Sequence, residues 1–245
     1  MKTELGDYML DSNDLLQIEV YNEEDIIAYK GFYNRYIKRV IDFVLAFVFF
    51  VFLFPVYFII SLAVVLDTGF PIFYKAERGG YKGKTFRIFK YRSMVKDADK
   101  IGGGTTALND SRITRVGNLL RKTKLDEIPQ LINIMRGEMS FIGPRPELIK
   151  YTSQYEGAEK LILEVRPGIT DYSSLEFINL DELVGTEENA DEIYETKVLK
   201  VKNSLRIKYV ATVSFKTDVE IFFKTVFSVI EKAFGFLFKN EHRGN

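Results

Sequence analysis

The chain has 245 residues, and its 34 Lys and Arg balance its 34 Asp and Glu, so the formal net charge is zero and indicates no nucleic-acid partner. The absence of cysteine excludes disulfides and thiol catalysis, and the single histidine, His242, lies in a polar C-terminal tail. Histidine-based acid–base catalysis and histidine-ligated zinc are therefore not expected, which leaves carboxylates, Lys, Arg and Tyr for any chemistry.

Residues 1–32 form an acidic N-terminal extension. Its only basic side chain before residue 30 is Lys2, against the carboxylates Glu4, Asp7, Asp11, Asp14, Glu19, Glu23, Glu24 and Asp25. No basic region precedes an apolar core, so the extension is not expected to be a signal peptide. We expect short local structure around residues 15–20, and the sequence gives this extension no readable function.

A mainly apolar segment of 27 residues, 40–66, follows. As one helix it would measure roughly 40 Å, longer than the roughly 30 Å hydrocarbon core of a bilayer, so a tilted spanning helix is one interpretation. However, Pro55 near its middle favours a kink. Both flanks are also basic, whereas a single span has one basic and one less basic flank. The basic residues are Lys30, Arg35, Lys38 and Arg39 before the segment and Lys75, Arg78, Lys82, Lys84, Arg87, Lys90 and Arg92 after it. A helix–break–helix within residues 33–70 that enters and leaves the cytoplasmic leaflet satisfies both features.

Short elements are expected after the apolar segment. Residues 71–75 and 84–90 alternate or cluster as short strands, and Gly79-Gly80 predicts the turn between them. Residues 102–106, Gly-Gly-Gly-Thr-Thr, predict a flexible loop, either a plain linker or a loop over a substrate. It is not a Walker motif, because no Gly-Lys-Ser/Thr follows. Residues 112–122 predict a basic helix or turn.

Residues 124–146 carry the strongest chemical signal. Two adjacent acids, Asp126 and Glu127, precede an apolar helical run. Because proline is favoured in the first turn of a helix, Pro129 predicts a helix start near Ile128. The acids either cap this helix or, beside amides that attract phosphates, act as a nucleophile or a metal ligand.

Two rigid cationic turns follow. In the Gly-Pro-Arg-Pro turn of residues 143–146, the second proline disfavours helical angles at Arg145. Little backbone entropy is then lost when this guanidinium grips a phosphate, which it can do bidentately. The other interpretation is an arginine in a surface turn. Arg166-Pro167-Gly168 is the second turn of this kind.

The C-terminal part predicts an acidic exposed loop or helix over residues 181–195 and an amphipathic helix from residue 215 onward. Lys216, Lys224 and Lys232 lie off the centre of its apolar face. The apolar residues at three- and four-residue spacing are Phe215, Val219, Phe222, Val226, Val229, Ile230, Ala233 and Leu237. This helix lies either on a membrane surface or against the core.

Three ordered motifs resemble the bacterial sugar transferase family, the monotopic phosphoglycosyl transferases. They are Leu-Asp-Glu-Ile-Pro-Gln-Leu at 125–131, Met-Ser-Phe-Ile-Gly-Pro-Arg-Pro at 139–146 and Arg-Pro-Gly-Ile-Thr at 166–170. The resemblance covers about residues 33–238. The run Lys-Tyr-Arg-Ser-Met that starts at Lys90 also resembles the family's basic motif beside the active site.

The resemblance implies a mainly helical α+β fold. A re-entrant membrane helix–break–helix would precede a small cytosolic catalytic domain, residues 71–245, with short strands and amphipathic surface helices. The family's entry motif is matched by Lys38, Arg39 and Asp42, and Pro55 stands at the break. The family often has a small polar residue before this proline, where this chain has Phe54.

The implied reaction moves a sugar 1-phosphate from a UDP-sugar to undecaprenyl phosphate, at the cytoplasmic face of the bacterial inner membrane. Its products are the polyprenyl-diphosphate-sugar and UMP, and it is the first membrane step of polysaccharide or glycoconjugate synthesis, before downstream glycosyltransferases. The resemblance makes Asp126 the nucleophile, through a covalent sugar-phosphoryl-aspartate, and Glu127 the ligand of Mg²⁺. The other implied site residues are Arg121 for catalysis and Lys90, Pro144, Arg145, Pro146 and Arg166 for substrate binding.

Two other function classes fit parts of the sequence. A membrane-anchored adaptor would recruit partners through the acidic extension and would show no turnover. A magnesium-dependent pyrophosphate hydrolase would release nucleotide without a lipid acceptor. The sugar, the polymer and the oligomeric state are not readable, and the family's usual glycine after the 166–170 turn is replaced here by Asp171-Tyr-Ser-Ser.

Overall fold

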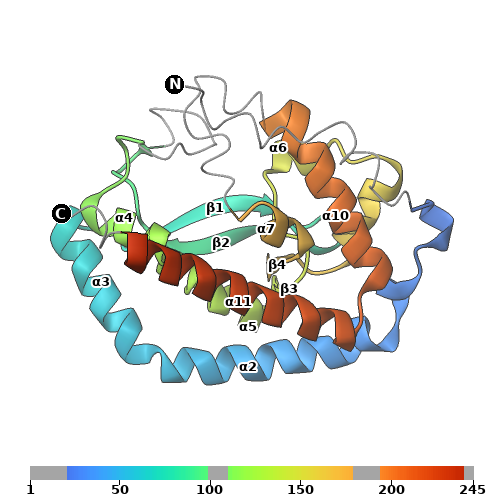
Figure 1. Cartoon of the computed structure of the whole chain (residues 1–245), viewed down its shortest axis with the longest axis horizontal. Helices are drawn as coiled ribbons and strands as arrows, with labels where there is room; N and C mark the ends of the chain where they lie inside the picture. The colour runs from blue at the N-terminus through green and yellow to red at the C-terminus, as the bar shows by residue number, and fades with distance from the viewer. Residues whose placement is uncertain (1–20, 99–109, 179–193, 240–245) are drawn as a thin grey trace.

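A computed structural model describes residues 21–98, 110–178 and 194–239 (Figure 1). The fold is mainly helical α+β, as the sequence predicts, and the described residues contain two sheets of two strands each. The predictions for residues 15–20, for the glycine loop, for most of the acidic 181–195 segment and for His242 lie outside these ranges. The first described residues form two short 3₁₀ turns, Glu23–Asp25 and Ala28–Lys30.

A bent pair of helices borders the molecule. A π-helical turn, Tyr33–Ile37, leads into α2 (Lys38–Phe52), which α3 (Phe54–Thr68) follows at an angle of 64° (Figure 1). The bend lies beside Pro55, which has no N–H to give to the carbonyl four residues earlier and therefore favours a break. Among the described residues no single helix is long and apolar enough to cross a membrane. The bent pair passes that test only when its two halves are taken together.

One side of this helix pair is buried and the other is apolar and exposed. Ala46 of α2 and Tyr57, Ile60 and Val64 of α3 pack into the core. The exposed apolar side chains are Val40, Phe43, Val44, Leu45, Phe47, Val48, Phe49, Val51 and Phe52 of α2 and Phe54, Phe58, Ile59, Leu62 and Leu66 of α3. Soluble monomers rarely expose an apolar surface of this extent, so it marks an interaction surface.

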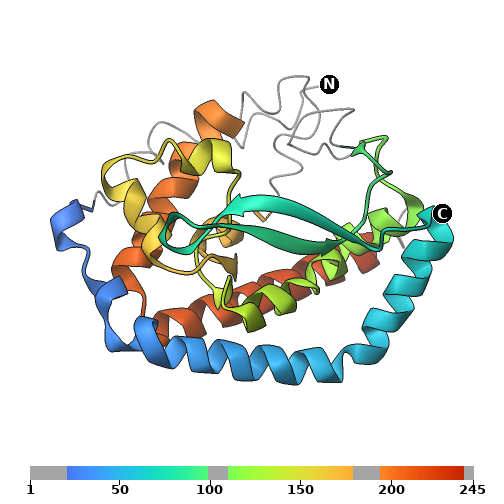
Figure 2. The ribbon, with the colours of Figure 1, turned by 180° about the vertical axis from the view of Figure 1, so that it is seen from behind.

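The predicted hairpin is present but its turn comes later than expected. Strand β1 (Phe73–Gly79) pairs antiparallel with β2 (Thr85–Tyr91), and Figure 2 shows this hairpin on the face opposite α11 (Phe215–Lys239). The sequence places the turn at Gly79-Gly80, but Gly79 is the last paired residue of β1. The chain reverses at Tyr81–Gly83, where Lys82 and Gly83 take positive φ angles of 56° and 70°.

The carboxylate pair lies between two helices. Helix α4 (Arg115–Lys122) confirms the basic helix, and a 3₁₀ turn, η7 (Leu125–Glu127), carries both acids. Helix α5 (Gln130–Arg136) then begins at Gln130, two residues later than predicted, because Pro129 is its N-cap rather than a residue of its first turn. Helix α5 packs between α2 and β2.

The second sheet brings the two Arg–Pro turns together. Strands β3 (Ser140–Ile142) and β4 (Gly168–Thr170) are parallel, and each turn flanks one of them. Glycine is required where they meet: a Cβ on Gly143 would lie 2.4 Å from the carbonyl oxygen of Arg166, and one on Gly168 would lie 2.2 Å from the nitrogen of Gly143. Residues with side chains would push the turns apart.

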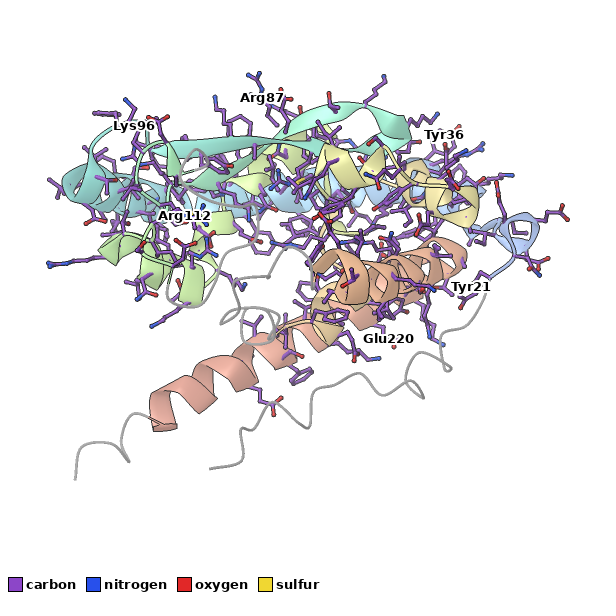
Figure 3. The ribbon with its side chains drawn as sticks, turned by 90° about the horizontal axis from the view of Figure 1, so that it is seen from above. Tyr21, Tyr36, Arg87, Lys96, Arg112 and Glu220 are labelled. Atoms are coloured by element: carbon purple, nitrogen blue, oxygen red, sulfur yellow. The ribbon has the colours of Figure 1, made fainter. Side chains whose placement is uncertain are left out.

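The remaining helices are α6 (Ile149–Thr152), the 3₁₀ helix Gly157–Glu164, α7 (Tyr172–Glu176), the π-helical turn Tyr194–Val198, α10 (Leu199–Thr212) and α11. Of these, α7 and α11 contact the second sheet, and α10 packs against α7. In α11 the buried positions are Thr217, Asp218 and Ile221, whereas Phe215, Val219 and Phe222 of the predicted apolar face are exposed. The predicted face is therefore not a core-packing face over these residues. Figure 3 shows α11 extending beyond the rest of the fold.

Candidate active site

The carboxylate pair forms the centre of the candidate site. Asp126 and Glu127 are 6% and 9% exposed, and the left-handed backbone of Lys124, with φ of 58°, turns the chain into η7. The hydroxyl of Tyr57, on α3, donates to the carbonyl of Ile128 at 2.8 Å. The apolar helix pair is thus in direct contact with the turn that carries the two acids.

Glu127 is held by two cations. Its Oε1 accepts a hydrogen bond from Lys90 Nζ at 2.8 Å and another from Arg145 Nη2. Burial alone would raise the pKa of Glu127, but the charges of Arg145 and Lys90 hold it well below its usual range. The side chains of Lys90 and Arg145 are 25% and 33% exposed, so an entering anion can reach both.

Asp126 has a different environment from its neighbour. Its Oδ1 is buried and has no hydrogen-bond partner among the described residues. Burial raises the pKa of Asp126, while the charges of Lys90 and Arg121 act in the opposite direction. Two adjacent carboxylates therefore differ in chemistry: one is neutralised by cations and the other presents an oxygen without a partner.

Gln130 is a polar residue that the sequence analysis did not single out. It is 1% exposed, and its Nε2 is a second buried polar atom without a partner in the described part of the chain. It belongs to the Leu-Asp-Glu-Ile-Pro-Gln-Leu motif of residues 125–131, four residues after Asp126, and this is the sequence signal that could have selected it. Unsatisfied buried groups are costly in general and cluster at functional sites.

Asn133 aligns Lys90 with the acids. This fully buried side chain on α5 accepts from the backbone N–H of Phe89 at 2.9 Å and donates to the carbonyl of Arg87 at 2.8 Å and to Glu138 at 2.7 Å. These bonds fix α5 against the free edge of β2, directly before Lys90. The two contacts with β2 join residues 44 and 46 positions apart, and the sequence gives no sign of them.

The first Arg–Pro turn places Arg145 in the site. Its Nη1 donates to the carbonyl of Ile169 at 2.9 Å, and its backbone N–H donates to Asp171 at 3.3 Å. Pro144 is buried, and its carbonyl accepts from the backbone of Gly168 at 3.0 Å. Pro146 lies on the other side of Arg145 and completes the turn. The turn is thus held by β4, and only one guanidinium nitrogen goes to Glu127.

Arg166 is predicted to bind substrate, as Arg145 is, but its side chain does not contact Asp126 or Glu127. Its Nε donates to the carbonyl of Gly137 at 3.0 Å, and its guanidinium lies 4.9 Å from the ring of Tyr81. Gly137 follows the C-terminus of α5, whereas the acids precede its N-terminus. The two cationic turns meet through their backbones, but the two side chains lie at opposite ends of α5.

The predicted entry motif joins the helix pair to the rest of the fold. Lys38 forms a buried ion pair with Asp218 of α11, and Asp42 accepts from the backbone N–H of Phe141 at 3.2 Å. Arg39 donates to two carbonyls at the C-terminus of α5, at 2.6 and 2.8 Å. These residues position α2 and take no direct part in the carboxylate site.

A polar cluster behind the Arg145 turn was not predicted at all. Glu147 accepts from Arg206 Nη2 at 2.6 Å and from the hydroxyl of Tyr194, and Lys202 lies beside them on α10. Arg206 is 1% exposed, and it lies 59 residues from its partner in the sequence. The hydrophobic periodicity of the sequence did not predict that Lys202 and Arg206 are buried, because charged residues on a helix usually face the solvent.

A metal ion at this site would need coordinating atoms from a bound substrate as well as from the protein. Among residues 21–98, 110–178 and 194–239, no group of three His, Cys, Asp or Glu side chains could hold an ion. The carboxylate pair nevertheless fits Mg²⁺, which protein sites often hold through one or two carboxylates while substrate phosphates and water supply the other positions. Glu127, the predicted ligand, is the carboxylate that would hold the ion, once Lys90 or Arg145 turns from it to the phosphates.

Comparison with known proteins shows which family the chain resembles. The family model described as bacterial sugar transferase matches residues 33–232. The UDP-glucose:undecaprenyl-phosphate glucose-1-phosphate transferase of Escherichia coli (strain K12) is 36% identical over 198 residues, which cover 79% of this chain and 40% of that protein. The exopolysaccharide production protein ExoY of Sinorhizobium fredii (strain NBRC 101917 / NGR234) is 33% identical over 204 residues, which cover 77% of this chain and 83% of that protein.

A third relative matches the chain over a shorter stretch. The putative undecaprenyl-phosphate N-acetylgalactosaminyl 1-phosphate transferase of Bacillus subtilis (strain 168) is 41% identical over 120 residues, 49% of this chain and 67% of that protein. The chain spans less than half the length of the Escherichia coli relative. The family match, however, extends over most of the chain, from the helix pair to α11. The chain belongs to the bacterial sugar transferase family.

Proposed function

We propose that the protein transfers a sugar 1-phosphate from a UDP-sugar to undecaprenyl phosphate and releases UMP. The observation that carries the proposal is the pairing of two unlike carboxylates. Asp126 presents an oxygen that has no hydrogen-bond partner in the described part of the chain, and Glu127 is held by Lys90 and Arg145. Relatives whose names state this type of reaction support it. The product would be the first lipid-linked sugar of a polysaccharide or glycoconjugate, ready for downstream glycosyltransferases.

The proposed chemistry proceeds in two displacements at one phosphorus atom. A carboxylate oxygen of Asp126 attacks the sugar-bearing phosphate of the donor, and the bond from that phosphorus to the oxygen of UMP breaks. A phosphate oxygen of the lipid then attacks the same phosphorus, and the acyl-phosphate bond breaks and returns the Asp126 carboxylate. Each step exchanges one phosphorus–oxygen bond for another, so no further reactant is required.

The cations would change partners when the donor binds. In the structure Lys90 and Arg145 each donate a hydrogen bond to Glu127. A diphosphate carries more charge and more acceptor oxygens than one carboxylate, so it competes well for both side chains. Transfer of these hydrogen bonds to the donor would leave Glu127 available as a ligand beside Asp126.

Magnesium would be held by Glu127, with Asp126 close by, and would supply charge neutralisation for the departing UMP. We expect EDTA to abolish UMP release and excess MgCl₂ to restore it. The unfolding midpoint is expected to stay unchanged in EDTA, because Lys90 and Arg145 already neutralise Glu127 in the metal-free fold. Full activity in EDTA, or a loss that magnesium does not reverse, would contradict the metal assignment.

We further propose that α2 and α3 enter and leave one leaflet of the bacterial inner membrane, with the catalytic part on the cytoplasmic face. The exposed apolar side of the bent pair is the surface that a bilayer would cover. Both flanks of the pair are basic, which agrees with two ends on the cytoplasmic side. The exposed apolar residues of α11, such as Phe223 and Phe227, suit the membrane surface.

This topology predicts that Lys30 and Lys75 lie on the same side of the membrane. The chain has no cysteine, so Lys30→Cys and Lys75→Cys each introduce a single thiol. Both thiols are expected to react with a membrane-impermeant maleimide in opened cells and neither in intact cells. Labelling of one flank from outside would show a spanning helix instead.

Pro55 provides a second test of the topology. Pro55→Leu restores the N–H that the helix lacks at the bend, so the segment is expected to straighten in part and expose one flank to the outside. Phe54→Leu is the matched control, because it keeps the apolar character and changes no backbone donor. Equal labelling patterns in both variants would exclude Pro55 as the cause of the bend.

Turnover of nucleotide sugars distinguishes this function from the other two classes. The purified chain would be supplied with a panel of UDP-sugars, with and without undecaprenyl phosphate, and UMP release would be measured. We expect stoichiometric UMP without the lipid and multiple turnovers with it, for one preferred sugar. Lipid-independent turnover would indicate a hydrolase, and no release with any donor would indicate an adaptor.

A further inference from the structure

Lys202 is a nearly buried cation that pairs with no carboxylate among the described residues. Its side chain lies on α10 and the residue is 8% exposed, yet it forms no ion pair with any acid in the described part of the chain. Its polar contact is the hydroxyl oxygen of Tyr194 at 3.5 Å. The ammonium also lies 4.8 Å from the ring of Tyr194 and 5.6 Å from the ring of Phe177.

The nearby acid offsets this charge only in part. Glu147 already accepts from Arg206 at 2.6 Å and from the Tyr194 hydroxyl, so the cluster holds two cations and one carboxylate. Aromatic rings offset only part of the cost of burying an ammonium ion. Burial and the charge of Arg206 lower the pKa of Lys202 to about 8, so it remains mostly protonated at neutral pH. A protein gains no stability from such a residue, and a bound anion explains its presence better.

The position of Lys202 indicates which anion. Glu147 and Arg145 belong to one turn, separated by Pro146, and the charges of both Arg145 and Asp171 act on Lys202. Asp171 accepts the backbone N–H of Arg145. Lys202 contacts the Tyr194 hydroxyl, which donates to Glu147. Lys202 therefore lies beside the turn that carries Arg145, whereas Glu127 lies at the guanidinium of Arg145.

We propose that Lys202 is a further anion-binding residue of the site, which binds a phosphate oxygen of the nucleotide diphosphate beside Arg145. The aromatic rings of Tyr194 and Phe177 form its apolar surroundings and exclude water from the contact. The inference rests on the proposed function, because it takes the donor to be a nucleoside diphosphate sugar. In that arrangement Arg145 and Lys202 both bind the diphosphate, and Asp126 attacks the phosphate to be transferred.

The test is the affinity of the full chain, purified in detergent, for UDP and for uridine in the presence of MgCl₂. Lys202→Met, which keeps the length and removes the charge, is expected to weaken UDP binding about tenfold, the loss of one charge-assisted hydrogen bond. Binding of uridine should not change. Lys202→Arg should recover part of the affinity, and Lys200→Met, an exposed lysine on the same helix, serves as the matched control.

Thermal unfolding separates binding from a structural role. Since Lys202→Met removes a buried charge without a carboxylate partner, the unfolding midpoint is expected to stay or rise. UDP affinity within twofold of the wild type would overturn the proposal, as would a wild type that binds no UDP, and so would a loss of affinity accompanied by a lower midpoint. A wild type that binds UDP in this Lys202-dependent way but gives no lipid-dependent UMP release would contradict the proposed function and leave the anion site standing.

Discussion

Asp126→Asn is expected to abolish UMP release, with a fall in kcat of at least about 1000-fold, the scale on which enzymes lose rate when a nucleophile is removed. The amide has nearly the shape of the carboxylate but cannot attack phosphorus. Because Oδ1 of Asp126 has no hydrogen-bond partner in the described structure, the substitution breaks no contact at that atom. Membrane insertion and the unfolding midpoint should therefore remain close to those of the wild type.

The covalent step can be observed directly. When donor is supplied without lipid, mass spectrometry should find a sugar-phosphate adduct on the peptide that contains Asp126, and this adduct should be absent from Asp126→Asn. Steady-state kinetics should be ping-pong, since UMP leaves before the lipid reacts. Asp25→Asn, at an exposed carboxylate, is the control for the chemical change itself. Substantial activity in Asp126→Asn, or kinetics that require both substrates before UMP leaves, would rule out the covalent mechanism.

Local sequence signals were sufficient for the elements that position the acids. Pro55 predicts the bend because it removes one backbone hydrogen bond within a single helical turn. The hairpin is predicted by the short strand-like runs on either side of two glycines. The basic helix α4 and the acids before α5 likewise depend on residues within a few positions of each other. Boundaries were less well predicted: β1 ends at Gly79 rather than at residue 75, α4 starts at Arg115 rather than at residue 112, and α5 starts at Gln130 rather than near Ile128. Local residue preferences overlap at the ends of elements, so they locate an element better than its limits.

The contacts that individual side chains make could not be predicted from local sequence in the same way. Arg145 and Arg166 occur in similar Arg-Pro turns, yet one guanidinium reaches Glu127 and the other reaches Gly137. The difference arises from the parallel pairing of β3 and β4, which a sequence pattern of three-residue strands does not reveal. The apolar face of α11 was identified, but periodicity does not tell whether such a face meets the core or a membrane.

The site also contains polar residues with no local signal. Asn133 acts through hydrogen bonds to the edge of β2, and Arg206 through an ion pair with Glu147. Each contact spans more than 40 residues and depends on how α5 and α10 pack. Asparagine and arginine on a helix are ordinarily surface residues, so burial was the decisive fact, and burial becomes known only from the fold.

Arg145→Lys should lower kcat/KM for the donor about 100-fold although the charge is kept. In the structure Nη1 of Arg145 is committed to the carbonyl of Ile169 and Nη2 to Glu127, a pair of directions that only a planar fork supplies. A lysine ammonium can satisfy one of these positions, so it would either lose its anchor on β4 or fail to reach the phosphate. Loss of a buried, charge-assisted contact of about 2–3 kcal/mol corresponds to this factor.

Two matched substitutions make the Arg145 result specific. Arg87→Lys, on a side chain that points out from the hairpin (Figure 3) and pairs only loosely with Glu77 at 3.3 Å, should leave kcat/KM within twofold. Arg166→Lys is the sharper comparison, because its guanidinium lies at the far end of α5. We expect a smaller loss there than at Arg145, and the loss should come with a lower unfolding midpoint, since the contact with Gly137 supports the fold. Equal catalytic losses at both arginines with unchanged midpoints would mean that the donor extends along the whole of α5. Near-normal activity of Arg145→Lys would reduce the Gly-Pro-Arg-Pro turn to a structural element.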